Sequence, residues 1–151
     1  MSDVRRVLVV DDESDIRLIV GLNVELAGMQ FGQAANGAEA IDMLRTGEWD
    51  GCILDLAMPR TDGYTVLREL KKDGTLDQIA VVVLSARGTP QAAIEALEAG
   101  AHAHLTKPFS PGAVAKTIEE LIEVTPKERE ERRRRMLEHA GRLDRLGMPT
   151  V

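Results

Sequence analysis

Short apolar runs alternate along the chain with segments of helical periodicity. Residues 7–10, 52–54 and 80–84 are continuous apolar runs, and residues 101–105 form a weaker one. Runs without polar alternation are typical of strands that are buried on both faces of a parallel sheet. Residues 30–35 predict a further strand from a fainter pattern.

Between these strands, apolar residues recur at intervals of three and four, as on one face of a helix. The pattern includes Ile16, Val20 and Val24, then Val66, Leu67 and Leu70, and later Val114, Ile118, Leu121 and Ile122. Asn36 is placed to cap a helix, and Ser110 before Pro111 is a typical helix start. Five repeats of strand and helix predict an open, doubly wound α/β fold around a parallel sheet.

A separate charged helix is expected at the C-terminal end. Thr125, Pro126 and Glu128 form a helix start with a capping box. Glutamates precede arginines by four residues in three pairs, which are Glu128 with Arg132, Glu130 with Arg134, and Glu131 with Arg135. Met136, Ala140 and Leu143 form a narrow apolar stripe. Gly141 weakens this helix by about 1 kcal/mol relative to alanine, so we expect it to need a surface to pack on.

Length and charge agree with one domain and an appendage. The chain has 151 residues and a net charge of -6, which divides into -9 for residues 1–125 and +3 for residues 126–151. We therefore expect a domain at 1–125 and a charged helical extension at 126–151. The acidic domain argues against broad nucleic-acid binding.

Targeting signals are not evident in the sequence. The N-terminal apolar run of residues 7–10 is too short for a signal peptide, and no segment approaches the roughly 20 apolar residues of a membrane span. The single cysteine, Cys52, cannot form an internal disulfide. We expect a soluble, cytoplasmic protein that does not bind membranes.

Polar residues that could bind a ligand or react follow four of the predicted strands. Asp11 and Asp12 follow the first, Asp55 the third, Ser85 the fourth and Lys107 the fifth. Ligands of doubly wound sheets bind at the carboxyl ends of the strands, so these side chains are expected to converge. Each has an ordinary explanation when taken alone, as a helix cap, a turn residue or a surface lysine, but their joint occurrence favours a site.

Three carboxylates in one site need a cation, because two unit charges about 4 Å apart repel by roughly 4 kcal/mol at an effective dielectric of about 20. Hard oxygen ligands favour Mg²⁺. Asp55 is then placed to attack phosphorus, while Lys107 and the Ser85 hydroxyl contact phosphoryl oxygens. The sequence thus predicts phosphoryl transfer to a carboxylate.

The chain resembles the receiver domains of bacterial two-component response regulators over about residues 4–124. The matching stretches are 7–13 (VLVVDDE), 53–59 (ILDLAMP), 62–63 (DG), 83–86 (VLSA) and 105–109 (LTKPF). The resemblance implies a flavodoxin-like fold, with five parallel strands in the order 2-1-3-4-5.

The resemblance also implies a role for each site residue. Asp55 is the phosphoacceptor, and Mg²⁺ is bound by Asp55, by Asp12, by Asp11 mainly through water, and by the backbone carbonyl of Ala57. Ser85 and Lys107 hold the phosphoryl oxygens, and the peptide bond between Lys107 and Pro108 is expected to be cis. The implied function is a switch that turns over no separate substrate. It accepts its phosphoryl group from a sensor histidine kinase or a phosphotransfer protein.

Two positions depart from the family pattern: Thr61 replaces the methionine common before Asp62 and Gly63, and the more consequential change is at position 104. His104 stands where receivers usually carry a tyrosine or phenylalanine that moves inward together with the residue at Ser85. We hypothesise that His104 is a smaller switch residue whose protonation near neutral pH biases the output. The alternative is a partly exposed histidine without a role.

Other functions fit the residues less well. An aspartyl-phosphate phosphatase needs an acid at Ala57, and an FMN carrier would place its phosphate against Asp11 and Asp12. A receiver that works without phosphorylation leaves the intact site unexplained. Output is expected through a downstream protein partner, with direct DNA binding unlikely. The extension could serve in a homodimer, dock on the switch face, bind a kinase, contact nucleic acid or remain solvated.

Overall fold

The computed structural model describes residues 4–58 and 62–148, and Pro59 of the predicted motif lies outside this part. Five strands form one parallel sheet in the order β2-β1-β3-β4-β5, which confirms the predicted fold. They are β1 (Arg6–Val10), β2 (Gln30–Ala34), β3 (Gly51–Asp55), β4 (Ala80–Ser85) and β5 (Ala103–Thr106). The helices are α1 (Ser14–Leu26), α2 (Gly37–Leu44), α3 (Gly63–Lys72), α4 (Pro90–Glu98), α5 (Pro111–Glu123) and α6 (Pro126–Leu146), with a 3₁₀ turn, η1 (Thr75–Asp77).

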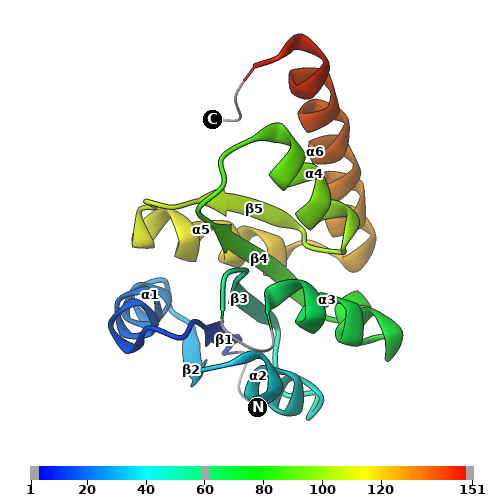
Figure 1. Ribbon diagram of the computed structural model, residues 1–151. Coiled ribbons are helices and arrows are strands. Elements are labelled where there is room, and N and C mark those ends of the chain that lie inside the picture. The colour runs from blue at the N-terminus through cyan, green and yellow to red at the C-terminus, as the bar shows by residue number, and fades with distance from the viewer. Residues whose placement is uncertain (1–3, 59–61, 149–151) are drawn as a thin grey trace.

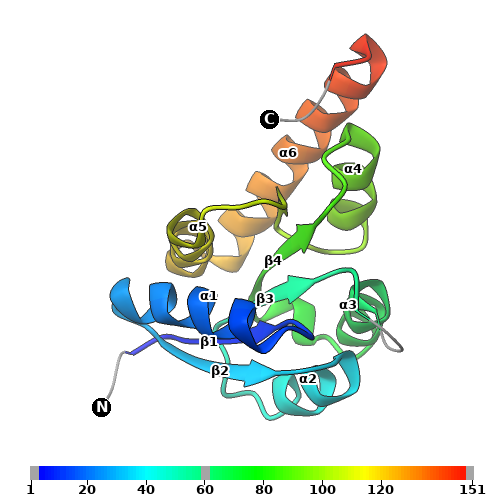
Figure 2. The ribbon, with the colours of Figure 1, turned by 60° about the vertical axis from the view of Figure 1, so that its left-hand side comes forward.

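The helices cover both faces of the sheet, as Figure 1 and Figure 2 show. Alternate residues of each central strand point to opposite faces, so Leu8 joins the core under α2, α3 and α4, whereas Val7 joins the core under α1 and α5. β3 and β4 are buried at every position. Burial on both faces explains their continuous apolar sequences.

The predicted helix caps are present. Asn36 accepts a hydrogen bond from the Glu39 N–H, and Ser110 accepts one from the Ala113 N–H. Thr125 and Glu128 form the capping box that begins α6. None of the helices in the ranges described is long and apolar enough to cross a membrane.

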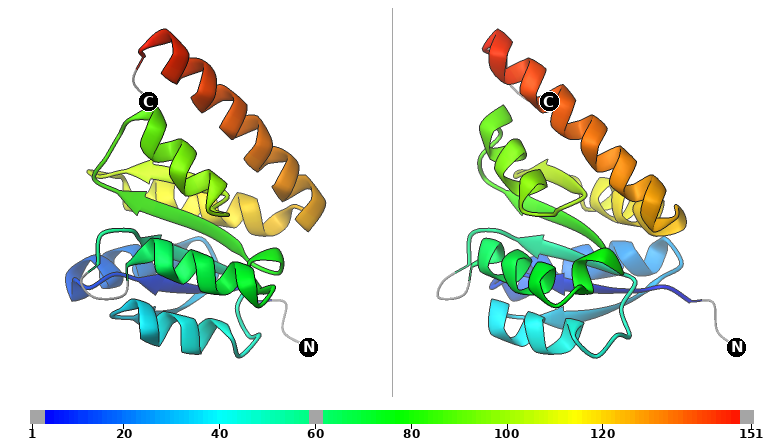
Figure 3. Two further views of the ribbon diagram at one scale, coloured as in Figure 1. Left: turned by 45° about the vertical axis from the view of Figure 1, so that its right-hand side comes forward. Right: turned by 90° about the vertical axis from the view of Figure 1, so that its right-hand side faces the viewer.

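The helix α6 packs along α4 of the same chain, and its last turns extend past the end of α4 (Figure 3). Arg129 is 4% exposed and donates a hydrogen bond to the Leu121 carbonyl near the end of α5 (3.1 Å). Arg133 donates one to the Leu97 carbonyl near the end of α4 (2.6 Å). Cations at these positions satisfy terminal carbonyls and oppose the negative ends of two helix dipoles.

The ion pairing within α6 differs from the prediction. Glu130 pairs with Arg133, three residues on, through two hydrogen bonds of 2.6 and 2.9 Å. In the parts of the chain that the structure describes, the three pairs expected at a spacing of four are not within 4 Å. Packing explains the pairing of Glu130, because Arg133 also bonds to the Leu97 carbonyl on α4, and Glu128 instead accepts hydrogen bonds from Thr125 in the capping box.

The first prediction concerns two glycines of α6. A methyl group at Gly141 would meet only the end of the Arg145 side chain, at 3.5 Å, so Gly141→Ala should stabilise the helix by about 1 kcal/mol. Gly147 ends the helix with φ +67, where an alanine side chain is strained, so Gly147→Ala should destabilise it by about 1 kcal/mol. Hydrogen exchange of the α6 amides measures both changes. Equal effects of the two substitutions would contradict the prediction.

The second prediction concerns the buried His102, which accepts a hydrogen bond from the Val81 N–H through Nδ1 (3.0 Å). Burial, assisted by Arg129, lowers the pKa of His102 from 6.5 to about 4. Below pH 6.5 the unfolded chain therefore binds a proton that the folded chain excludes, so the free energy of unfolding falls as the pH drops toward 4, by up to about 3 kcal/mol.

His102→Asn keeps an oxygen that can accept the Val81 N–H but does not titrate. Its stability should fall less than that of the wild type between about pH 7 and about pH 5, as measured by urea unfolding. An unchanged pH dependence in this variant would show that other groups cause the acid sensitivity.

Candidate functional site

The carboxyl ends of four strands bring the predicted residues to one edge of the sheet. Asp11 directly follows β1, and Asp55 is the last residue of β3. The strand register pairs Asp55 with Leu84 and pairs Ser85 with Thr106, the residue before Lys107. The convergence expected from the sequence is therefore present in the fold.

Carboxylate oxygens of Asp11, Asp12 and Asp55 lie within 4.8 Å of one another. Asp11 and Asp55 are only 1% and 2% exposed, whereas Asp12 is exposed. The Lys107 ammonium lies 3.3 Å from Asp55 Oδ1 and 3.9 Å from Asp11 Oδ2. Among residues 4–58 and 62–148, Lys107 is the one cation within 4 Å of these acids, so the described part of the cluster carries more negative than positive charge.

The pKa of Asp11 reflects its buried position and its charged neighbours. Its pKa is raised to about 6, first by burial and also by the neighbouring Asp55, against the lowering effect of a hydrogen bond from the Glu13 N–H. Its other oxygen, Oδ2, is buried and has no hydrogen-bond partner in the described residues. A buried carboxylate oxygen without a donor is costly unless a cation binds it.

The donor set fits Mg²⁺. The three acids provide hard oxygen ligands, and Asp11 Oδ2 is a buried oxygen that such an ion would satisfy. Asp55 Oδ1 accepts a hydrogen bond from the Ala57 N–H (3.0 Å), which places the backbone of Ala57 beside the cluster. The role of the Ala57 carbonyl as a ligand stays a prediction.

Ser85 lies at the end of β4 and is 6% exposed. Its Oγ accepts a hydrogen bond from the Arg87 N–H (3.1 Å). The peptide bond between Lys107 and Pro108 is cis, as predicted. Contacts of Ser85 and Lys107 with a phosphoryl group stay predictions.

His104 is half-buried on β5, and its Nε2 is buried without a hydrogen-bond partner among the described atoms. Burial, followed by the nearby Arg87, lowers the pKa of His104 below 6.5. The neutral form is therefore favoured at neutral pH, which weakens the hypothesis of a proton switch there. Movement of the side chain as a switch stays a prediction.

An ion pair that the sequence did not reveal joins the loop after β4 to α4. Arg87 Nη1 lies 3.6 Å from Glu95 Oε2. Glu95 also raises the pKa of Tyr64 at the start of α3, although burial contributes more. No sequence pattern links these three residues, because only the packing of α3 against the β4–α4 region brings them together.

Comparison with known proteins identifies the family. A family model described as the response regulator receiver domain matches residues 7–119. This chain is a member of the response regulator receiver family, which consists of signalling proteins of two-component systems.

Individual relatives agree with this assignment. The response regulator MprA of Mycobacterium tuberculosis is 38% identical over 105 residues, which are 70% of this chain and 45% of that protein. The probable transcriptional regulator ycf27 of Cyanophora paradoxa is 36% identical over 121 residues, covering 80% of this chain and 49% of that protein. The chain thus spans about half the length of these curated relatives.

The fold is also similar to solved receiver structures. The receiver domain of the Francisella response regulator 1452 has a TM-score of 0.74 and 31% identity, covering 79% of this chain and 97% of that domain. About a fifth of this chain lies outside the part that aligns with that domain. The family model ends at residue 119, so α6 lies beyond it.

The third prediction tests the acidic cluster. Asp12→Asn removes one charge from the cluster and should weaken Mg²⁺ binding by about tenfold, measured by isothermal titration calorimetry. Glu13→Gln is a matched control, because Glu13 is exposed, adjacent and outside the cluster. The prediction is wrong if both variants bind Mg²⁺ equally.

Proposed function

We propose that this chain is a phosphoacceptor switch in which Asp55 receives a phosphoryl group from a sensor histidine kinase or a phosphotransfer protein. The observation that carries the proposal is the buried carboxylate of Asp55, 3.3 Å from the Lys107 ammonium and grouped with Asp11 and Asp12. The receiver domain occupies residues 1–125, and residues 126–151 are its helical extension.

Mg²⁺, held by Asp11, Asp12, Asp55 and the Ala57 carbonyl, would neutralise charge on the phosphoryl oxygens. An oxygen of Asp55 attacks phosphorus, and the bond between phosphorus and the donor's histidine nitrogen breaks. The electron pair stays on that nitrogen. Lys107 and the Ser85 hydroxyl stabilise the transferred oxygens, and Lys107 exchanges its contact with Asp55 for one with the new phosphoryl group.

The exposed face of α1 supports docking of the phosphodonor. Leu18, Leu22 and Leu26 recur every four residues and are 49%, 47% and 86% exposed, with Ile19 beside them at 46%. The helix that carries this apolar stripe begins two residues after Asp12, so a helical donor packed on it can bring its phosphohistidine to the acidic cluster.

The chain acts as a switch rather than as an enzyme with a separate substrate. Assistance to its own phosphorylation comes from the acidic cluster and Lys107. The residue two positions after Asp55 is Ala57, whereas a phosphatase of the aspartyl-phosphate type needs an acidic residue there. Output passes through a downstream protein partner, and the proposed kinase partner makes the cytoplasm the compartment of action.

The fourth prediction tests the phosphoacceptor. Wild-type protein incubated with acetyl phosphate and Mg²⁺ should gain one phosphoryl group, seen as a mass shift in the intact protein. Asp55→Asn should gain none, because the amide is not a nucleophile toward phosphorus. Chelation of Mg²⁺ should suppress the reaction in the wild type.

Glu13→Gln is again the control, and it should be phosphorylated like the wild type. Phosphorylation of the Asp55→Asn variant would refute the assignment of Asp55. Profiling phosphotransfer from the sensor kinases of the source organism, with the same pair of proteins, then identifies the donor.

A further inference from the structure

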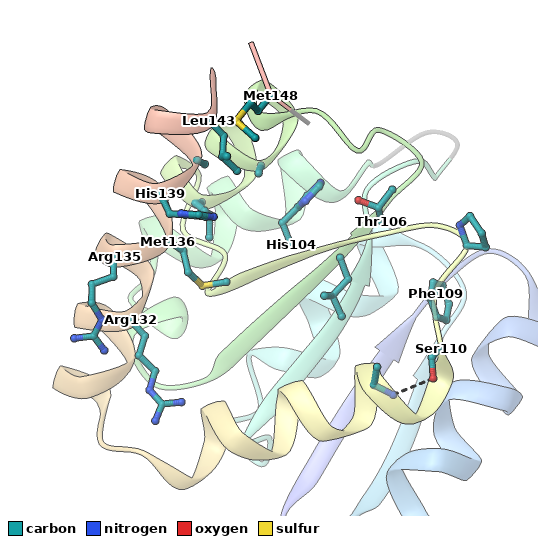
Figure 4. Close-up of a pocket in the computed structure, with 16 residues that line it drawn as sticks. His104, Thr106, Phe109, Ser110, Arg132, Arg135, Met136, His139, Leu143 and Met148 are labelled. Carbon is teal, nitrogen blue, oxygen red and sulfur yellow. Dashed lines mark hydrogen bonds between the residues drawn. The ribbon is translucent and has the colours of Figure 1, made fainter. Parts of the chain in front are cut away.

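An open groove lies between α6, the edge strand β5 and the first turn of α5. It has a volume of about 1040 Å³. β5 is the last strand of the sheet and has β4 as its neighbour on one side only. Figure 4 shows Arg132, Arg135, Met136, His139 and Leu143 on α6 across the groove from His104 on β5. Without α6 this groove would lack one of its walls.

Most of the groove surface is apolar. Its large apolar side chains come from α4, β5, α6, the loop after β5 and the residues after α6. They are Leu97, Leu105, Phe109, Met136, Leu143 and Met148. Met136 remains 39% exposed even though α6 packs on α4. An occupant with apolar side chains would gain free energy by removing this surface from water.

The charged side chains that line the groove are basic. They are Arg132 and Arg135, and no Asp or Glu of the described residues lines the groove, although the sequence contains 25 of these acids. Within residues 4–58 and 62–148, neither Arg132 nor Arg135 has a carboxylate oxygen within 4 Å. Their guanidinium groups are thus available to pair with carboxylates from outside.

The groove also contains a polar atom without a partner. His104 lines it, and the Nε2 atom of His104 is buried with no hydrogen bond in the described part of the chain. A buried nitrogen of this kind is costly to leave unpaired. A polar group of an occupant that reached this nitrogen would remove the cost.

We propose that this groove binds a short segment of a partner protein in which carboxylates stand beside large apolar side chains. The carboxylates pair with Arg132 and Arg135, and the apolar side chains cover Leu105, Phe109 and Met136. The inference rests on the proposed function in one respect, because it takes binding in this groove to be the output of phosphorylation at Asp55. The link is β5, which leads directly into Lys107.

Two other occupants fit these observations less well. Nucleic acid offers negative charge but no aliphatic side chains for the groove, and residues 1–125 carry a net charge of -9 that repels it. A two-fold dimer through this groove would place the same patch of both copies together. The arginines of the two α6 helices would then face one another.

The fifth prediction tests the groove with a display library of random twelve-residue peptides, selected on the immobilised full chain. Enriched peptides should combine Asp or Glu with Leu, Ile, Phe or Trp. Replacing Arg132→Gln together with Arg135→Gln should weaken their binding at least about tenfold in fluorescence polarisation, because two charge-assisted contacts are lost.

The matched control is Arg134→Gln together with Arg142→Gln, which changes the net charge equally at exposed positions outside the groove. It should bind the peptides like the wild type. Mg²⁺ binding should be unchanged in both double variants, so failure of the groove is distinguished from failure of the acidic cluster. Circular dichroism confirms that each variant is folded.

Any of four results would overturn the proposal. Three concern the peptides: a selection without enrichment, equal loss of affinity in the two double variants, and enriched peptides that lack acidic residues. A dimer in sedimentation that the Arg132 and Arg135 substitutions dissociate would also overturn it, since it would make a second copy the occupant.

Discussion

Repulsion among three carboxylates at the sheet edge is the constraint on which the functional part of the structure depends. Asp11 and Asp55 are almost fully buried, yet Lys107 is the cation within 4 Å of them in the described part of the chain. Water screens the buried charges of Asp11 and Asp55 only weakly, so the backbone must hold them together. The parallel sheet does so because its central strands are buried on both faces and hydrogen-bonded to neighbours on both sides. Burial of the large apolar core therefore offsets the free energy of bringing the three carboxylates together. The same repulsion favours binding of a divalent cation at this site.

Much of this arrangement could be predicted because its signals are local. The strands β1, β3 and β4 are recognisable from their apolar runs alone, and the caps at Asn36, Ser110 and Thr125 each involve residues three positions apart. Convergence of Asp11, Asp55 and Lys107 followed from one topological rule, that parallel strands end at a common edge. The strand order itself needed the family resemblance, because sequence patterns do not state which strands are neighbours.

The parts that could not be predicted depend on contacts between distant segments. The sequence indicates that α6 needs a surface to pack on but not which one, because the contact of Arg133 with the Leu97 carbonyl joins positions 36 residues apart. Arg129 becomes buried because the turn between α5 and α6 brings it over the Leu121 carbonyl. His102 lies in a weak apolar run, and nothing nearby in sequence indicates that Val81 donates to its ring. The groove beside β5 depends on the contacts of Arg129 and Arg133, which hold α6 against the ends of α5 and α4.

The strand β5 connects the two sites physically. Its residues His104 and Thr106 line the groove, and Lys107 follows immediately with its ammonium against Asp55. A phosphoryl group on Asp55 would take over the contact of Lys107, so a change at the acidic cluster acts on a segment that also forms the groove. Linkage is reciprocal, and an occupant of the groove that favours one position of β5 must alter phosphorylation by the same free energy. A shift from 1:99 to 99:1 requires about 5.5 kcal/mol of differential binding. A partner that pairs with both arginines and covers the apolar surface can supply part of that energy only if its contacts with the groove differ between the phosphorylated and the unphosphorylated protein.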